Sequence, residues 1–356
     1  MGVKNRREKR LFIPRMATQP LSRVDGERSS GYLAGSHESL AVETSERENA
    51  NPRLAVVNTC CKYLVRQFKE LIGPQVLVDS MGVFEMGLFE GKKGLIVGVA
   101  NDRSIAWAIA QEVMNQGGQC GFTHLPDRPD DEKRKNRHRV HKCIDGNDNA
   151  KFLVPLNVQD DEQIKEVISQ TEEAFGTIDF LLHSVAFADR ADLQRDTVET
   201  SREGFKMAMD ISAYSLISLT NAARRILSPN SSVLCMSYFG GEKCVPGYNV
   251  MGICKAALEA TTRYLAYDLG PSGCRVNSLS AGPLKTLAGS AAGVGEMLKM
   301  YQHMAPLGRN ITHEEVGRSG AFLLSEMSNG ITGEILHVDG GYNIMGSPGR
   351  LLDEMK

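Results

Sequence analysis

The chain has 356 residues, of which 42% are hydrophobic, so it can build one large core or two smaller ones. Its net charge of −2 gives no electrostatic argument for binding nucleic acid or an anionic membrane. No apolar run reaches the roughly 18 residues of a transmembrane helix, and the eight cysteines form no C-x-x-C pair. We therefore expect a cytoplasmic protein with reduced thiols, no membrane or nucleic-acid partner, and no metal site.

Residues 1–85 differ in composition from the rest of the chain. A basic start, MGVKNRREKRLFIPRM, precedes a polar stretch with few large apolar residues, followed by weak helical spacing over residues 54–72. Such a polar stretch buries too little apolar surface to become ordered, and the basic start lacks the apolar core of a secretory signal. We expect residues 1–85 to be a disordered extension or to precede the true start, with Met81 and Met86 as candidate first residues.

From Gly87 onward, short apolar runs alternate with helical patterns, and a charged excursion at 126–150 interrupts them. This alternation, with strands rich in Val, Ile and Leu, predicts a single α/β domain with a Rossmann-like, doubly wound, seven-stranded parallel sheet. The predicted strands are Gly94–Val99, Cys120–Leu125, Phe152–Asn157, Ile178–Val185, Ser232–Ser237, Arg275–Ala281 and Ile335–Val338. The predicted helices are Ser104–Asn115, Asp161–Phe175, Glu203–Ile226, one from Tyr248 onward, and His313–Ser325 with a Thr312/Glu315 capping box.

The residues that follow the first two strands suggest a dinucleotide site, because parallel sheets bind ligands at the carboxyl ends of their strands. Gly98 and Ser104 flank a turn before a helix start, although the usual G-x-G-x-x-G is missing. We expect Ser104 to cap that helix or to bind phosphate. Leu125 occupies the position where an acid would bind the adenosine ribose, with Asp127 two residues later, and Arg128 leaves NADPH possible.

Later strands end in residues that suit the same cofactor. Asn157 and Val158 follow the third strand and are expected to face the adenine. The fourth strand ends in Ser-Val-Ala-Phe-Ala at 184–188, where small side chains let the backbone approach a cofactor closely. A glycine-proline turn with a hydroxyl at 281–286 follows the sixth strand and suits a carboxamide or a phosphate.

One helix carries the candidate proton donor. Tyr248 and Lys255 are seven residues apart, which is about two helical turns, so both project from one face. A neighbouring ammonium favours the phenolate and is expected to lower the tyrosine pKa. Taken alone, the pair fits an ordinary amphipathic helix better than a catalytic site, because such pairs are common on helices.

Several motifs together resemble a known family. They are GVANDRSIAWAIA, REGFKMAMDISAYSL, SYFGGEKCVPGYNVMGICKAALEA, RVNSLSAGPLKTLA and ITGEILHVDGGYNIMG. Residues 86–346 resemble the short-chain dehydrogenase/reductase superfamily and, within it, the NADH-dependent enoyl-acyl-carrier-protein reductases of bacterial type II fatty-acid synthesis. Ordinary superfamily members space tyrosine and lysine by four residues, whereas here Gly252 occupies that position and Tyr238 lies ten residues upstream of Tyr248.

The resemblance assigns roles to individual residues. It implies Tyr248, Lys255 and Tyr238 as catalytic residues, with Tyr238 also lining the acyl site together with Ala188 and Met251. The implied cofactor-binding residues are Gly98, Ser104, Ile105, Leu125, Asn157, Val158, Val185, Ala186, Lys255, Leu284 and Thr286, with Leu284 also near the acyl chain.

The resemblance also implies an activity: reduction of trans-2-enoyl thioesters on acyl carrier protein with NADH, by a homotetramer, NADPH not being excluded. It favours Met86 as the start, with a tail at 347–356. The composition of Lys285–Met300, which is rich in Gly, Ala and Ser before an amphipathic end, suggests a mobile lid, for which a plain surface helix is the alternative. Two other functions stay open: a reductase of ketones or 3-oxoacyl substrates, which would use a serine near Ser237, and a non-catalytic NAD-binding sensor.

Overall fold

Apolar runs form the strands of one sheet in the computed structural model, which describes residues 87–286 and 294–354. These residues belong to one compact unit. Most strand residues of β1, β2 and β4 to β6 are buried because helices cover both faces of the sheet. The strands are β1 (Lys93–Val97), β2 (Gln119–His124), β3 (Ala150–Pro155), β4 (Ile178–His183), β5 (Leu227–Ser237), β6 (Arg275–Ala281) and β7 (Ile335–Val338).

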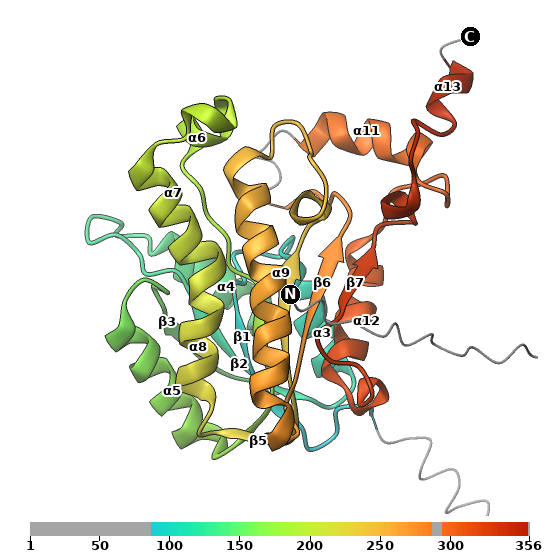
Figure 1. Cartoon of the computed structure of the whole chain (residues 1–356). Coiled ribbons are helices and arrows are strands. Elements are labelled where there is room, and N and C mark those ends of the chain that lie inside the picture. The colour runs from blue at the N-terminus through green and yellow to red at the C-terminus, as the bar shows by residue number, and fades with distance from the viewer. Residues whose placement is uncertain (1–86, 287–293, 355–356) are drawn as a thin grey trace, which may run out of the picture. The chain divides into compact units, whose positions relative to one another are not determined.

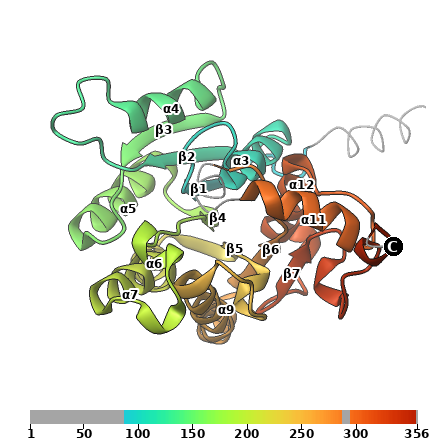
Figure 2. The same ribbon diagram turned by 90° about the horizontal axis from the view of Figure 1, so that it is seen from above.

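The sheet has seven strands in the order β3-β2-β1-β4-β5-β6-β7, and all neighbouring pairs are parallel. Strand order reverses between β1 and β4, where Leu95 pairs with Leu181. Figure 2 shows the sheet from above, with β1 and β4 at its centre. The predicted doubly wound parallel sheet is therefore confirmed, and the reversal places the ligand crevice beside β1 and β4.

Helices cover the sheet in two layers, each with its own apolar core. One core joins α3 and α12 to the sheet, and the other joins α5, α8 and α9 to its opposite face. The helices are α3 (Ile105–Asn115), α4 (Lys135–Ile144), α5 (Asp161–Phe175), α6 (Arg190–Gln194), α7 (Arg202–Met209), α8 (Ser215–Ala223), α9 (Asn249–Leu269), α11 (Val294–Met304), α12 (His313–Leu324) and α13 (Leu351–Glu354). The Thr312/Glu315 capping box at the start of α12 is confirmed.

Three predicted segments differ from the structure. The charged excursion contains a helix, α4, whose single buried residue, Val140, gives a weak periodic signal. The long helix predicted over 203–226 is interrupted by a π-helical turn at Asp210–Tyr214, between α7 and α8. The tail at 347–356 contains the short helix α13. The extension at 1–85 and residues 287–293 of the proposed lid lie outside the described residues, whereas residues 294–300 of that segment form the start of α11.

Candidate active site

The loops after β1, β4, β5 and β6 reach the same edge of the sheet because these strands are parallel. Helices α6 and α11 lie at this edge as well (Figure 1). Apart from Lys255, which lies in the second turn of α9, the residues that we predicted to bind a cofactor or substrate follow a strand or lie near the start of a helix at this edge. The edge is therefore the place where a candidate site must be built.

The loop between β1 and α3 holds its shape through its own polar groups. Gly98 has a φ of 110°, and a Cβ atom there would lie 2.1 Å from the carbonyl oxygen of Ser184. The Ser104 Oγ accepts hydrogen bonds from the N–H groups of Ala100 (2.9 Å) and Asn101 (3.1 Å). The expectation that Ser104 caps α3 through its side chain is therefore wrong, because its hydroxyl folds the loop instead.

After β2, the carboxylate of Asp127 forms hydrogen bonds with the helix that follows, α4. Leu125 is 63% exposed at the end of β2. The Asp127 carboxylate accepts hydrogen bonds from the N–H groups of Asn136 (2.6 Å) and Arg137 (3.3 Å), in the first turn of α4. Asp127 therefore accepts hydrogen bonds from backbone N–H groups that have no partner within α4. These bonds tie the start of the charged excursion to that helix.

The other predicted cofactor residues differ in exposure. The Asn157 side chain accepts a hydrogen bond from the N–H of Gln159 (3.2 Å), which shapes the turn before α5. The side chains of Val158 and Leu284 are buried in the protein. They fix the position of the local backbone, and that backbone can line the site. Ile105, Val185 and Thr286 are half-buried, whereas Ala186 is exposed.

The loop after β4 is held by a hydroxyl from the π-helical turn. The Ser212 Oγ accepts a hydrogen bond from the Phe187 N–H and donates one to the Phe187 carbonyl oxygen, both at 3.0 Å. Ala188, beside Phe187, packs in a small apolar cluster that also contains Met251 and Tyr248. The structure thus brings Ala188 and Met251, two of the three predicted substrate residues, next to the proposed proton donor.

Four tyrosines gather at the end of β5, and sequence reasoning found only two of them. The rings of Tyr238 and Tyr248 lie edge to face, with centroids 4.7 Å apart. The Tyr238 hydroxyl lies 3.5 Å from that of Tyr301, whose ring stacks on Tyr342 at 4.0 Å. Tyr301 directly follows the proposed lid segment, and Tyr342 lies in the terminal motif, but only the fold shows that they meet the other two.

Tyr248, Gly252 and Lys255 share one stripe of α9, and their packing explains the seven-residue spacing. A Cβ atom on Gly252 would lie 2.8 Å from the carbonyl oxygen of Gly240, in the short helix η3 (Phe239–Gly241). A lysine four residues after Tyr248 would therefore collide with this corner. Lys255 is only 5% exposed, and its Nζ donates a hydrogen bond to the Met236 carbonyl oxygen (2.7 Å).

The protonation of this pair differs from our expectation. Desolvation raises the pKa of Tyr248 above its ordinary value, and Lys255 makes no contribution to that shift. Burial lowers the pKa of Lys255. The prediction that Lys255 lowers the tyrosine pKa is therefore wrong for the protein on its own, and Tyr248 is a protonated hydrogen-bond donor at neutral pH.

This chain is similar in sequence to known proteins. The family model described as "Enoyl-(Acyl carrier protein) reductase" matches residues 98–343. The chain belongs to this enoyl-(acyl carrier protein) reductase family. It is 46% identical over 257 residues to "Enoyl-[acyl-carrier-protein] reductase [NADH] FabI" of Nostoc sp., covering 72% of this chain and 98% of that protein. The relative of the same name from Aquifex aeolicus is 46% identical over 267 residues, covering 74% and 96%.

Solved structures of the enoyl-(acyl carrier protein) reductase family agree with the fold. The Aquifex aeolicus crystal structure has a TM-score of 0.68 and 45% identity, covering 73% of this chain and all of that one. The Anaplasma phagocytophilum reductase, solved in complex with NAD, has a TM-score of 0.68 and 41% identity, covering 74% and 96%. Both the predicted family and the predicted fold are thereby confirmed.

Ser237 bears on the alternative that this family member reduces ketones. A ketone reductase would aim this hydroxyl at the substrate oxygen. Here the Ser237 Oγ donates a hydrogen bond to the Glu259 Oε1 at 2.5 Å, and both residues are buried. The Ser237 hydroxyl therefore donates its hydrogen bond to Glu259 and not to a substrate oxygen.

Two features are absent from the described residues, 87–286 and 294–354. Their helices are all too short or too polar to cross a membrane. Within the same residues, His, Cys, Asp and Glu side chains form no group of three that could hold a metal ion.

Proposed function

We propose that this protein is an enoyl-acyl-carrier-protein reductase of type II fatty-acid synthesis, which reduces trans-2-enoyl thioesters with NADH. The observation that carries the proposal is the α9 stripe. The packing of Gly240 on Gly252 leaves Lys255 as the lysine that accompanies Tyr248, and Tyr238 lies edge to face with Tyr248. The family membership supports the same reaction.

The residues present fit a dinucleotide. Gly98 has no side chain, so the β1–α3 loop can pack closely against the Ser184 backbone. A pyrophosphate can then approach the start of α3 closely. NADH, when bound, supplies the hydride that is added to the β-carbon of the substrate. Gly98, Ser104, Ile105, Leu125, Asn157, Val158, Val185, Ala186, Lys255, Leu284 and Thr286 would hold it. We infer the preference for NADH from the relatives, whose names give NADH as the cofactor.

Tyr248 and Lys255 divide the work in this proposal. Tyr248 donates a hydrogen bond to the thioester oxygen and stabilises the negative charge that develops there as the enolate forms. The α-carbon of the enolate then takes up a proton, from Tyr248 or from water, which gives the saturated thioester. The raised pKa of Tyr248 suits its role as a hydrogen-bond donor, because the proton stays on the phenol at neutral pH. An ammonium has three donors; Lys255 uses one on Met236 and can offer the others to the nicotinamide ribose.

A comparison of substrates tests the function. The oxidation of NADH and of NADPH would be followed by absorbance, with crotonyl thioester and with acetoacetyl thioester. We expect NADH oxidation with the enoyl substrate. Oxidation with the oxo substrate alone would show a ketone reductase, and NADH binding without turnover of either would show a sensor.

We also propose that the protein acts as a cytoplasmic homotetramer on substrate carried by acyl carrier protein. Large apolar side chains are exposed on the neighbouring helices α7 to α9, as expected of an interface, and β7 is an edge of the sheet within the described residues. These side chains are Phe205, Tyr214, Ile217, Ile253, Tyr264 and Tyr267. Light scattering should show a tetramer for the unsubstituted protein. The Tyr264→Glu variant should form a smaller species.

A further inference from the structure

The stripe that carries Tyr248 and Lys255 continues one turn further, to Glu259. Glu259 follows Lys255 by four residues, so it lies on the same face of α9. Only 3% of Glu259 is exposed, which is unusual because acidic residues are rarely buried unless they are paired. The role proposed for Tyr248 and Lys255 does not use this carboxyl group.

Glu259 and Lys255 bind two consecutive residues of β5. The Lys255 Nζ donates a hydrogen bond to the Met236 carbonyl oxygen, and the Glu259 Oε1 accepts one from the Ser237 hydroxyl. Tyr238 is the next residue along the chain. The two bonds therefore tie α9 to the strand end from which Tyr238 projects.

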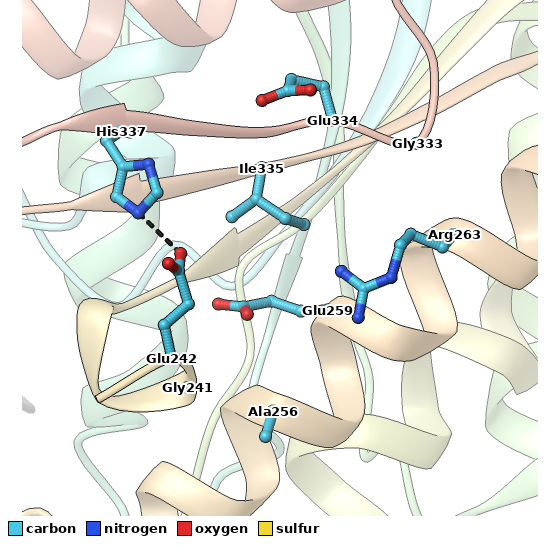
Figure 3. A pocket seen from close by; sticks show the side chains of 9 residues that line it. All are labelled: Gly241, Glu242, Ala256, Glu259, Arg263, Gly333, Glu334, Ile335 and His337. Carbon is cyan, nitrogen blue, oxygen red and sulfur yellow. Dashed lines mark ion pairs between the residues drawn. The ribbon is translucent and has the colours of Figure 1, made fainter. Parts of the chain in front are cut away.

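Glu259 also lines a hollow of about 520 Å³. In Figure 3 its side chain extends from α9 into the space between Glu242 and Arg263. A Cβ atom on Gly241 would lie 2.7 Å from the Glu259 Oε1, so the glycine lets the η3 corner close over the carboxyl group. The remaining lining residues are Ala256, Gly333, Glu334, Ile335 and His337.

The charges around this pair come from several elements. Burial raises the pKa of Glu259, Glu242 raises it further, and Ser237, Arg263 and His337 lower it. Burial lowers the pKa of Lys255, whereas Cys235, Cys254 and Glu259 oppose that effect. His183 on β4 also interacts with the Lys255 charge.

We propose that Glu259 is a positioning residue of the reductase: it fixes Ser237 beside Tyr238, and its negative charge offsets the burial of the Lys255 ammonium. This inference rests on the proposed function, in which protonated Lys255 binds the cofactor ribose. The hollow gives Glu259 a route for exchanging its proton with solvent, so the charge of the pair depends on pH.

The test is a pH profile of Glu259→Gln, which keeps the size of the side chain and an acceptor for Ser237. Removing the negative charge should lower the pKa of Lys255. The alkaline limb of kcat/KM, and that of NADH affinity measured by fluorescence, should therefore move to lower pH by about one unit. Glu334→Gln, which removes a charge from the wall of the same hollow, is the control and should leave both limbs in place.

Ser237→Ala tests the positioning half, because it removes the hydrogen bond and keeps the charge. We expect kcat to fall about fivefold with the alkaline limb unmoved, and Ser237→Thr to restore kcat. If the alkaline limb of Glu259→Gln does not move, the proposal that Glu259 offsets the burial of the Lys255 ammonium is overturned. If kcat of Ser237→Ala is unchanged, the proposal that Glu259 positions Ser237 beside Tyr238 is overturned. If Glu259→Gln does not fold, Glu259→Met gives the same test of the charge. If the unsubstituted protein fails to reduce crotonyl thioester, the proposed function falls, whereas the fluorescence limbs still decide the Glu259 inference.

Discussion

The two strand–helix junctions at this edge of the sheet are built differently. At the junction from β1 to α3, polar groups bond within the loop: the Ser104 hydroxyl accepts from Ala100 and Asn101, a few residues away. At the junction from β5 to α9, side chains of the helix reach back to the strand, 19 residues away for Lys255 and 22 for Glu259. The β1–α3 junction is folded mainly by its own polar groups, with one outside contact from the His313 ring to the Arg103 carbonyl oxygen (3.0 Å). The β5–α9 junction is a clamp, in which side chains of the helix hold the strand end.

This difference matches what each junction must do. A phosphate is bound by backbone N–H groups, so the first junction needs only the correct backbone path and no side chain at Gly98. A proton donor must stay aimed at one atom, so the second junction needs side chains held by partners on another element. Substitutions at the first should therefore change cofactor affinity, and substitutions at the second should change the chemical step.

Tyr248→Phe should separate the two junctions most clearly. Losing the one donor aimed at the thioester oxygen should lower kcat about 100-fold to 1000-fold. The KM for NADH should stay close to that of the unsubstituted protein, because the β1–α3 loop is untouched. Steady-state rates with crotonyl thioester measure both. Tyr267→Phe, on an 82% exposed position of α9, is the matched control; an unchanged kcat in Tyr248→Phe would remove this tyrosine from its role.

Lys255→Met should affect both junctions, because the ammonium belongs to the clamp and is assigned to the cofactor ribose. The methionine keeps an apolar stem in a 5% exposed position, so the fold should survive. The loss of the two hydrogen bonds that the charged ammonium can offer to the ribose, at about 1.5 kcal/mol each, predicts an NADH affinity about 100-fold weaker. Fluorescence titration measures it, with the exposed Lys151→Met as control; unaltered NADH affinity would contradict the assigned role.

Gly98→Ala should affect the first junction alone. Its φ of 110° and the 2.1 Å approach to Ser184 force the backbone to shift, and such strain costs about 1–3 kcal/mol. We expect the KM for NADH to rise about tenfold, with kcat nearly unchanged, since one kcal/mol is roughly a fivefold change. Gly330→Ala, where a Cβ atom meets nothing within 4 Å, should bind NADH normally. Equal affinities in the two variants would show that the β1–α3 loop does not contact the cofactor.

The same contrast explains what the sequence could predict. Buried parallel strands and the Thr312/Glu315 capping box leave local patterns, so most of the elements were predicted within a few residues. The helix α4 was missed because only Val140 of its residues is buried, and the π-helical turn because Asp210–Tyr214 keeps a helical pattern. Tyr248 and Lys255 were found through a spacing on one helix.

Long-range partners were not predictable in this way. Nothing in the stretch around Tyr301 indicates that its hydroxyl meets that of Tyr238, 63 residues earlier. The pKa of Tyr248 was predicted in the wrong direction, because spacing shows a cation nearby and does not show how much protein surrounds the phenol. Desolvation depends on the whole fold, and here it is the largest cause of the raised pKa of Tyr248, to which Lys255 does not contribute.

Removing residues 1–85 should have the smallest effect, because both junctions lie beyond them. The matched region covers 98% of the Nostoc relative with 72% of this chain, and we propose that residues 86–346 form the working domain. A chain that starts at Met86 should keep kcat/KM for NADH and for crotonyl thioester within about twofold of the full chain. A chain that starts at Val97 lacks nearly all of β1, at the centre of the sheet, and should not fold. A tenfold loss in the Met86 chain would instead mean that the first 85 residues contribute to the site.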